Sequence, residues 1–162
     1  IAYRDVASAT NKLTLIAAML PANAISTHTV FCLKTTLDEH SQWALLGLLN
    51  SLVANYLVRL NVTTHVTTAI MSRLRVPRPG ATDLDRLAAL ALSLSKTGIT
   101  EDTDGYARLN SVAATLYGVT PDEYEFILES FPLIPKTQRD LCVAAFATKN
   151  KHRNTEAQKH GD

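Results

Sequence analysis

Apolar residues are arranged in two ways along the chain, in short runs near its start and in helical stripes further on. Residues 13–20 form an apolar run that ends at Pro21, and residues 27–35 are rich in β-branched and aromatic side chains. The turn-forming residues 21–26 separate the two runs. This pattern is typical of β-strands, so we predict strands within residues 1–37. The alanines of the first run leave a helix open there.

Residues 41–60 carry a wide apolar stripe. Leucine, valine and aromatic residues recur there at helical spacing, after a Ser41 that suits the N-cap position. The width of the stripe predicts one long helix that is buried on most sides, with Trp43 and Leu49 in the core. A membrane span is the competing interpretation, and polar residues that interrupt the run make it the weaker one. These polar residues are Gln42, Asn50, Ser51, Asn55 and Arg59.

A break follows at residues 77–80, Pro-Arg-Pro-Gly, and we take it as a domain boundary. Residues 61–76 before it are rich in Thr and Val, so a strand or an extended loop is expected there. Net charge changes sign at the break. Residues 1–80 carry seven basic and three acidic side chains, whereas residues 81–130 carry three basic and nine acidic ones. This asymmetry indicates two subdomains, or one face for an anionic partner and another for solvent.

Helices are predicted throughout the region after the break. Leucine and alanine share one face over residues 83–97, and a second helix is expected over residues 101–117, before Gly118. Thr120 is followed by Pro, Asp and Glu, which is the sequence of a capping box with Pro at the first helical position. It predicts a third helix that ends before Pro132.

The end of the chain is expected to lose regular structure. Residues 138–147 are predicted to add one or two helical turns, and residues 149–162 contain no apolar residue except Ala157, which predicts a disordered tail. The fold class predicted is therefore α+β. A small sheet packs on a long buried helix in residues 1–80, and a helical C-terminal subdomain follows in residues 81–148.

Composition narrows the class of protein. The 162 residues, 46% of them apolar and 19% charged, are enough to bury a core without disulfides or a metal. Two cysteines cannot form a disulfide framework, so a reducing, cytoplasmic location is expected. The chain opens at Ile1 with neither an initiator Met nor a signal peptide, and we expect it to be a piece of a longer protein.

Residue patterns that support catalysis, phosphate binding or metal binding are missing from the sequence. The six glycines are scattered, and the five histidines lack the spacing of metal ligands. Cys32 and Cys142 lie in apolar segments and are expected to be packed thiols. The acidic residues at 101–104 lack the further ligands of a calcium loop. We therefore predict no catalytic residue, cofactor or metal within this chain.

Polar residues at predicted strand ends and in loops suit nucleic acid. Lys and Arg can neutralise phosphates, while Asn, His, Arg and Thr can pair with base edges. An ordinary half-exposed sheet explains the same residues equally well, and Arg4 has a rival role as an ion-pair partner of Asp5. The candidates for DNA contact are Arg4, Asn11, Lys12, Thr14, His28, Thr63, His65 and Arg73.

Several segments follow one another in a specific order. Residues 3–21 open with Tyr-Arg-Asp-Val-Ala, residues 45–51 read Leu-Leu-Gly-Leu-Leu-Asn-Ser, residues 59–65 read Arg-Leu-Asn-Val-Thr-Thr-His, and residues 116–123 read Leu-Tyr-Gly-Val-Thr-Pro-Asp-Glu. Together they resemble the Taq-type C-terminal specificity domain, the target-recognition region of adenine-specific DNA methyltransferases and type IIG restriction-modification enzymes. The resemblance extends to about Phe146.

Two positions depart from the pattern of that family. Leu13 stands where the family has Arg, which removes a possible phosphate or base contact. Thr-His-Val-Thr at residues 64–67 replaces a Gly-His-hydrophobic-Asn sequence, so no role of that Asn applies here.

The resemblance implies a non-catalytic module that recognises the sequence of double-stranded DNA. Methyl transfer from S-adenosylmethionine would take place in an upstream domain, because the Asn/Asp-Pro-Pro-Tyr motif of the family does not occur in this sequence. The acidic residues 81–130 would face away from DNA and could dock on that methyltransferase domain or cap the sheet. The alternative is a structural or protein-interaction domain that packs against its parent chain without touching DNA.

Overall fold

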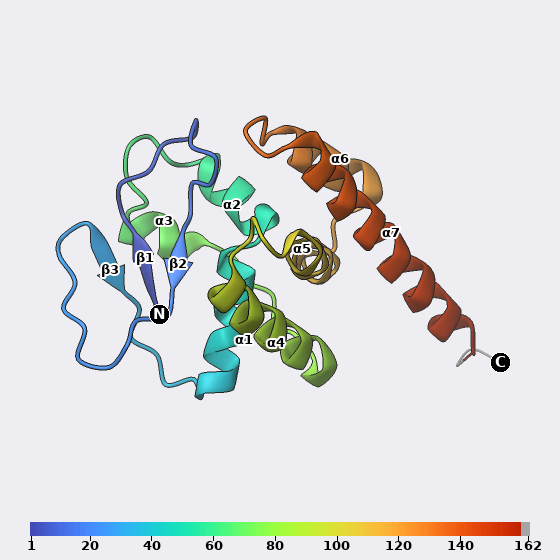
Figure 1. The fold of residues 1–162 in the computed structure, drawn as a ribbon, viewed down its shortest axis with the longest axis horizontal. Helices are drawn as coiled ribbons and strands as arrows, with labels where there is room; N and C mark the ends of the chain where they lie inside the picture. Colours follow the sequence, from blue (N-terminus) through green and yellow to red (C-terminus); the bar gives the residue numbers. More distant parts are fainter. Residues whose placement is uncertain (160–162) are drawn as a thin grey trace.

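A small antiparallel sheet lies at one side of a group of helices (Figure 1). The computed structural model describes the backbone of residues 1–159 and the side chains up to Lys149. Within these residues it has three strands and seven helices, which confirms the α+β class. The strands are β1 (Ala2–Arg4), β2 (Ala17–Ala18) and β3 (Val30–Cys32). The helices are α1 (Glu39–Leu49), α2 (Leu52–Arg59), α3 (Thr68–Arg73), α4 (Ala81–Thr97), α5 (Thr103–Tyr117), α6 (Pro121–Glu129) and α7 (Lys136–Lys159).

The strands are much shorter than the apolar runs that predict them. β1 is central, with Tyr3 opposite both Ala17 of β2 and Phe31 of β3. In the segment before β2, side chains of the helices take the hydrogen bonds that a longer strand would make. Asn55 Oδ1 accepts from the backbone N–H groups of Thr14 (3.0 Å) and Leu15 (2.9 Å). The backbone is thereby satisfied without a neighbouring strand.

The prediction of one long helix over residues 41–60 is wrong, because Asn50 and Ser51 separate α1 from α2. Ser51 is extended (ψ 155°) and caps α2 by accepting from the N–H of Ala54. The N–H of Leu52, which begins α2, donates to Asn110 Oδ1 of α5 at 2.6 Å. Side-chain acceptors therefore stabilise a new helix start at a point where the apolar stripe continues without interruption.

Residues 61–76 combine an extended loop with a short helix. The loop over 61–67 agrees with the prediction, but α3 follows at a place where β-branched residues predict no helix. Thr67 Oγ1 caps α3 by accepting from the N–H of Ile70 at 3.3 Å. Hydroxyl side chains favour N-caps as strongly as they disfavour helix interiors, which explains the difference.

Two apolar clusters share α1. Ala44 and Leu48 belong to a cluster with α4, α5, α6 and α7, whereas Leu46 and Leu49 belong to a cluster with the sheet. The two regions on either side of residues 77–80 therefore use the same helix. Trp43 is only partly buried and packs against the edges of both clusters, so its assignment to the core is corrected.

The close packing of α1 against α4 depends on Gly47. A Cβ atom at this position would lie 3.3 Å from the backbone oxygen of Leu87 and 3.4 Å from Ala91 Cβ. The two helix backbones approach each other because neither offers a bulky side chain at this contact.

The last helix is much longer than expected. α7 packs along α5 and α6, and its backbone stays helical to Lys159, so the predicted tail is wrong for residues 149–159. Lys, Arg, Gln, Glu and Ala continue a helix readily without an apolar face. Lys149 also donates to Asp83 of α4 at 2.7 Å. Residues 160–162 lie outside the described residues.

The capping sequence at Thr120 is confirmed. Thr120 Oγ1 accepts from the N–H of Glu123, and Glu123 Oε2 accepts from the N–H of Thr120 at 2.7 Å. Gly118 ends α5 in the left-handed conformation (φ 70°), as its position predicts.

We expect Leu49→Ala to lower the free energy of unfolding by about 2–5 kcal/mol, because Leu49 is buried and its loss leaves a cavity between α1 and the sheet. Chemical denaturation measures the change. The control is Leu60→Ala, at a leucine that is 63% exposed and should cost less than about 0.5 kcal/mol. Equal costs at the two positions would contradict this packing.

We expect Asn55→Ala to lower the free energy of unfolding by about 2–5 kcal/mol, because it leaves the buried N–H groups of Thr14 and Leu15 without acceptors. Asn61→Ala is the matched control, since Asn61 is exposed and donates only to the carbonyl of Leu57. Denaturation of both variants in urea gives the comparison. A cost below about 0.5 kcal/mol for Asn55→Ala would show that water replaces the amide.

Candidate nucleic-acid interface

Three segments that are distant in the sequence meet at Asp5. Its N–H donates to the carbonyl of Thr29 (2.8 Å), and its own carbonyl accepts from the N–H of Val66 (2.7 Å). Its carboxylate lies 2.8 Å from Nδ1 of His65. We name this contact of residues 4–7, 28–29 and 64–66 the Asp5 junction. It brings the segments that carry Arg4, His28 and His65 of the predicted set to the same end of the sheet.

The loop that carries His65 runs alongside the end of β1. Val6 and His65 form an antiparallel bridge, and the N–H of Ala7 donates to the carbonyl of Thr64 at 3.0 Å. Thr63, which precedes Thr64 in this loop, is exposed. The loop after β1 and the loop after α2 accordingly lie at the same end of the molecule, as Figure 1 shows.

The carboxylate of Asp5 pairs with His65 and, among the described side chains, not with Arg4. The rival role of Arg4 as the ion-pair partner of Asp5 is therefore not realised. Arg4 is half-buried, and its Nε is enclosed without a hydrogen-bond partner among the described residues. The carboxylate instead fixes the His65 ring, because it accepts the Nδ1–H and leaves Nε2 as an acceptor on the neutral ring.

The side chain of Arg59 forms hydrogen bonds with the inner side of the loop between β1 and β2. Its guanidinium donates to the carbonyl of Asn11 (2.6 Å), to Thr14 Oγ1 (3.2 Å) and to the carbonyl of Ser130 (2.6 Å). It also lies 4.0 Å from the ring centre of Phe131. Burial lowers the pKa of Arg59, but a guanidinium remains charged at neutral pH. Arg59 is therefore a structural cation.

The three predicted contacts in this loop have different environments. Lys12 is exposed, Asn11 is half-buried, and Thr14 is completely buried. Thr14 must be removed from the set of DNA contacts, because its hydroxyl lies between Arg59 and the carbonyl of Ser8. Its place near the start of the apolar run of residues 13–20 suggests a strand end, and its burial beneath Arg59 becomes visible only in the structure.

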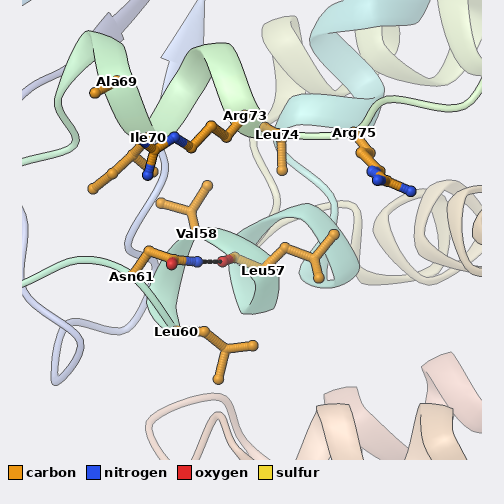
Figure 2. A pocket seen from close by; sticks show the side chains of 9 residues that line it. All are labelled: Leu57, Val58, Leu60, Asn61, Ala69, Ile70, Arg73, Leu74 and Arg75. Atoms are coloured by element: carbon orange, nitrogen blue, oxygen red, sulfur yellow. Dashed lines mark hydrogen bonds between the residues drawn. The ribbon is translucent and has the colours of Figure 1, made fainter.

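A hollow of about 290 Å³ lies between α2 and α3 (Figure 2). Apolar side chains of both helices form most of its lining, and Arg73 and Arg75 add two guanidinium groups. Both arginines are exposed. Arg73 belongs to the predicted set, whereas Arg75 does not. The sequence around Arg75 could have identified it as a candidate. Arg73 and Arg75 flank the partly buried Leu74, and because the chain is extended there (ψ 115°), both arginines lie on the side away from Leu74.

One continuous stretch of chain, residues 61–75, contributes to both the hollow and the Asp5 junction. Val66 follows His65 and is fully buried, and Ile70 and Met71 of α3 pack against the same apolar cluster. Residues 61–75 are thus anchored on their inner side and expose Thr63, His65, Arg73 and Arg75 on the other. Two exposed guanidinium groups beside an apolar lining suit contacts with phosphates, and Figure 2 shows their side chains extending to opposite sides of the hollow.

The two cysteines differ. Cys142 is fully buried, and burial raises the pKa of its thiol to about 11, as expected of a packed thiol. Cys32 is exposed at the end of β3, 3.4 Å from Ser26 Oγ, so the prediction of a packed thiol is wrong there. β3 is an edge strand of a very small sheet, and its outer positions are not covered.

The described part of the chain contains neither a metal-binding cluster nor a helix that could cross a membrane. No group of three or more His, Cys, Asp and Glu side chains there is arranged to hold a metal ion. None of the helices, within the same residues, combines the length and apolarity needed to cross a membrane. No family model, curated protein or solved structure matches this chain.

Proposed function

We propose that this chain is a DNA sequence-recognition module from the C-terminal part of a type IIG-like adenine-specific DNA methyltransferase, and that it does not itself catalyse a reaction. The ordered segments that resemble the Taq-type specificity domain support this proposal. The observation that supports it most is the Asp5 junction, where the segments that carry Arg4, His28 and His65 meet.

Exposed cations would supply affinity. Lys12, Arg73 and Arg75 are all exposed and, among the described side chains, none of them forms an ion pair with a carboxylate. Such groups can neutralise phosphates and release counterions, which makes binding sensitive to salt. They would fix the position of the module on the duplex without reading the sequence.

His65 and its neighbours would supply selectivity. The bond from Nδ1 to Asp5 leaves Nε2 able to accept a hydrogen bond from an exocyclic amino group of a base. Thr63 and His28 are exposed and lie on the two segments that join at the same junction. A ring whose orientation is already fixed loses little freedom on binding, which favours discrimination.

The acidic helices would face away from DNA. Residues 81–130 include α4, α5 and α6, whose net negative charge repels a phosphate backbone. We propose that this part docks on the upstream methyltransferase domain, in which S-adenosylmethionine would bind. A reducing cytoplasmic location accords with this function.

A protein-interaction domain is the second candidate. Large apolar side chains favour it, because Ile25 is 98% exposed and Phe126 is 64% exposed. Such residues are common at contacts between proteins. This function requires no salt-sensitive binding to DNA, so the two candidates are distinguished by one titration at two salt concentrations.

We expect Arg73→Ala and Lys12→Ala to weaken binding to all duplexes alike and to lower the salt slope by about one unit each, because each removes one phosphate contact. Fluorescence anisotropy with mixed-sequence duplex at two salt concentrations measures this. Arg108→Ala is the matched control, since it removes the same charge from α5, where Arg108 pairs with Asp104. Equal effects of the three variants would contradict the proposed face.

We expect His65→Ala to reduce discrimination by about 1–3 kcal/mol while leaving the salt slope unchanged, because a base contact is lost and no phosphate contact is. Discrimination is the ratio of affinities for a duplex enriched from a random pool and for its scrambled form. Asn11→Ala tests the neighbouring loop in the same way. Unchanged ratios for both variants would exclude these residues as readers of sequence.

We expect the chain alone to transfer no methyl group from labelled S-adenosylmethionine to DNA. The reason is chemical, since the tetrapeptide that positions the target adenine in the family does not occur in this sequence. Incorporation of label above a heat-denatured control would overturn the assignment as a non-catalytic module.

A further inference from the structure

A second hollow, of about 550 Å³, lies beside α2 next to the Arg73–Arg75 hollow. It is bounded by α2, the end of α5 and the start of α6, and Leu57 lines both hollows. Val53, Val119 and Ile127 give it apolar walls. Its volume falls in the range of about 300–1,000 Å³ that is typical of small-molecule sites.

Three aromatic rings line this hollow. Tyr56 of α2 and Phe126 of α6 stand at 81° to each other, with ring centres 6.3 Å apart. Tyr117 at the end of α5 is the third. Burial raises the pKa of Tyr117 to about 12, so its ring is uncharged at neutral pH. This edge-to-face contact is a usual packing of aromatic side chains, and it leaves much of the Phe126 side chain exposed beside the hollow.

Packing alone does not account for Phe126. It is 64% exposed, although it is one of only four phenylalanines in the chain. A phenylalanine placed on the surface beside another aromatic ring leaves its electron-rich face available to a ligand.

Two carboxylates make the hollow electronegative. Asp122 and Glu123, at the start of α6, line it, and no basic side chain does so among the described residues. Hydrogen bonds from the N–H of Thr120 (2.7 Å) and from its hydroxyl (3.0 Å) lower the pKa of Glu123. The charge of Glu123 is therefore present at neutral pH. An anion is disfavoured here and favoured in the neighbouring Arg73–Arg75 hollow.

We propose that this hollow binds an organic cation, specifically an alkylated ammonium group. Aromatic faces attract a cation whose charge is spread over methyl groups, the apolar walls contact those methyl groups, and the carboxylates provide long-range attraction. A phosphate or carboxylate ligand lacks all three interactions. The site is independent of DNA recognition, because it uses none of the residues assigned to the DNA face.

The test is a titration with choline, followed by the methyl NMR signals of Val53, Val119 and Ile127. The expected result is a saturable shift of these three signals and a much weaker one, by at least about fivefold in affinity, with the neutral isostere 3,3-dimethylbutan-1-ol. Equal affinity for choline and the isostere, or no saturable shift with choline, would overturn the proposal.

Substitutions in the hollow test whether the aromatic ring and the carboxylate contribute to choline binding. Phe126→Leu should weaken choline binding by about fivefold and Phe126→Tyr should preserve it, because leucine keeps the apolar surface but lacks the π face. Asp122→Asn should also weaken binding. Glu125→Gln is its matched control, since it removes the same charge from α6 at an exposed position outside the hollow. Equal effects of Asp122→Asn and Glu125→Gln, or no effect of Phe126→Leu, would contradict the site.

A second binding experiment, with peptides, identifies the source of the ammonium group. A short peptide with trimethyllysine is compared with the same peptide containing unmodified lysine. Binding of the modified peptide at least about tenfold tighter than choline indicates a methylated side chain as the natural guest, whereas equal affinity indicates a free small cation. Binding of the unmodified peptide with the same affinity as the modified one would overturn the preference for an alkylated group.

Discussion

Three amide side chains around α2, the half-buried Asn50 and the buried Asn55 and Asn110, hold the two halves of the molecule together. Asn50 exchanges two hydrogen bonds with the backbone of Ala17 in β2, Asn55 accepts from the segment before β2, and Asn110 of α5 accepts from the first residue of α2. Each amide satisfies buried backbone groups of another element. The sheet and the C-terminal helices are therefore both fixed to one pair of helices.

Arg59 extends this arrangement to the proposed DNA face. It stands at the end of α2 and bonds to the loop after β1 and to the turn after α6. With that loop fixed, the end of β1 can pair with residues 64–66, and the Asp5 junction forms. The positions of Lys12, His28 and His65 thus depend on an internal cation whose own charge is not offered to DNA.

The two hollows beside α2 differ in the charge of the side chains that line them. Arg73 and Arg75 lie at one, whereas Asp122 and Glu123 lie at the other. The separation follows from the sequence, because the basic residues precede the break at 77–80 and the acidic ones follow it. Under the two proposals, one small domain presents an anion-binding face and a cation-binding face that share Leu57 of α2.

The α+β class, the helices between residues 81 and 129 and the capped start of α6 follow from the sequence, because these depend on local spacing and on capping residues within a few positions of each other. Only the tertiary structure decided the break at Ser51, the burial of Thr14 and the exposure of Cys32. The first two depend on partners far along the chain, Asn110 for Leu52 and Arg59 for Thr14, and the third depends on the place of β3 at an edge of the sheet. Hydrophobic periodicity cannot report a hydrogen bond between residues 58 positions apart, and this is why the site had to be assembled from the fold.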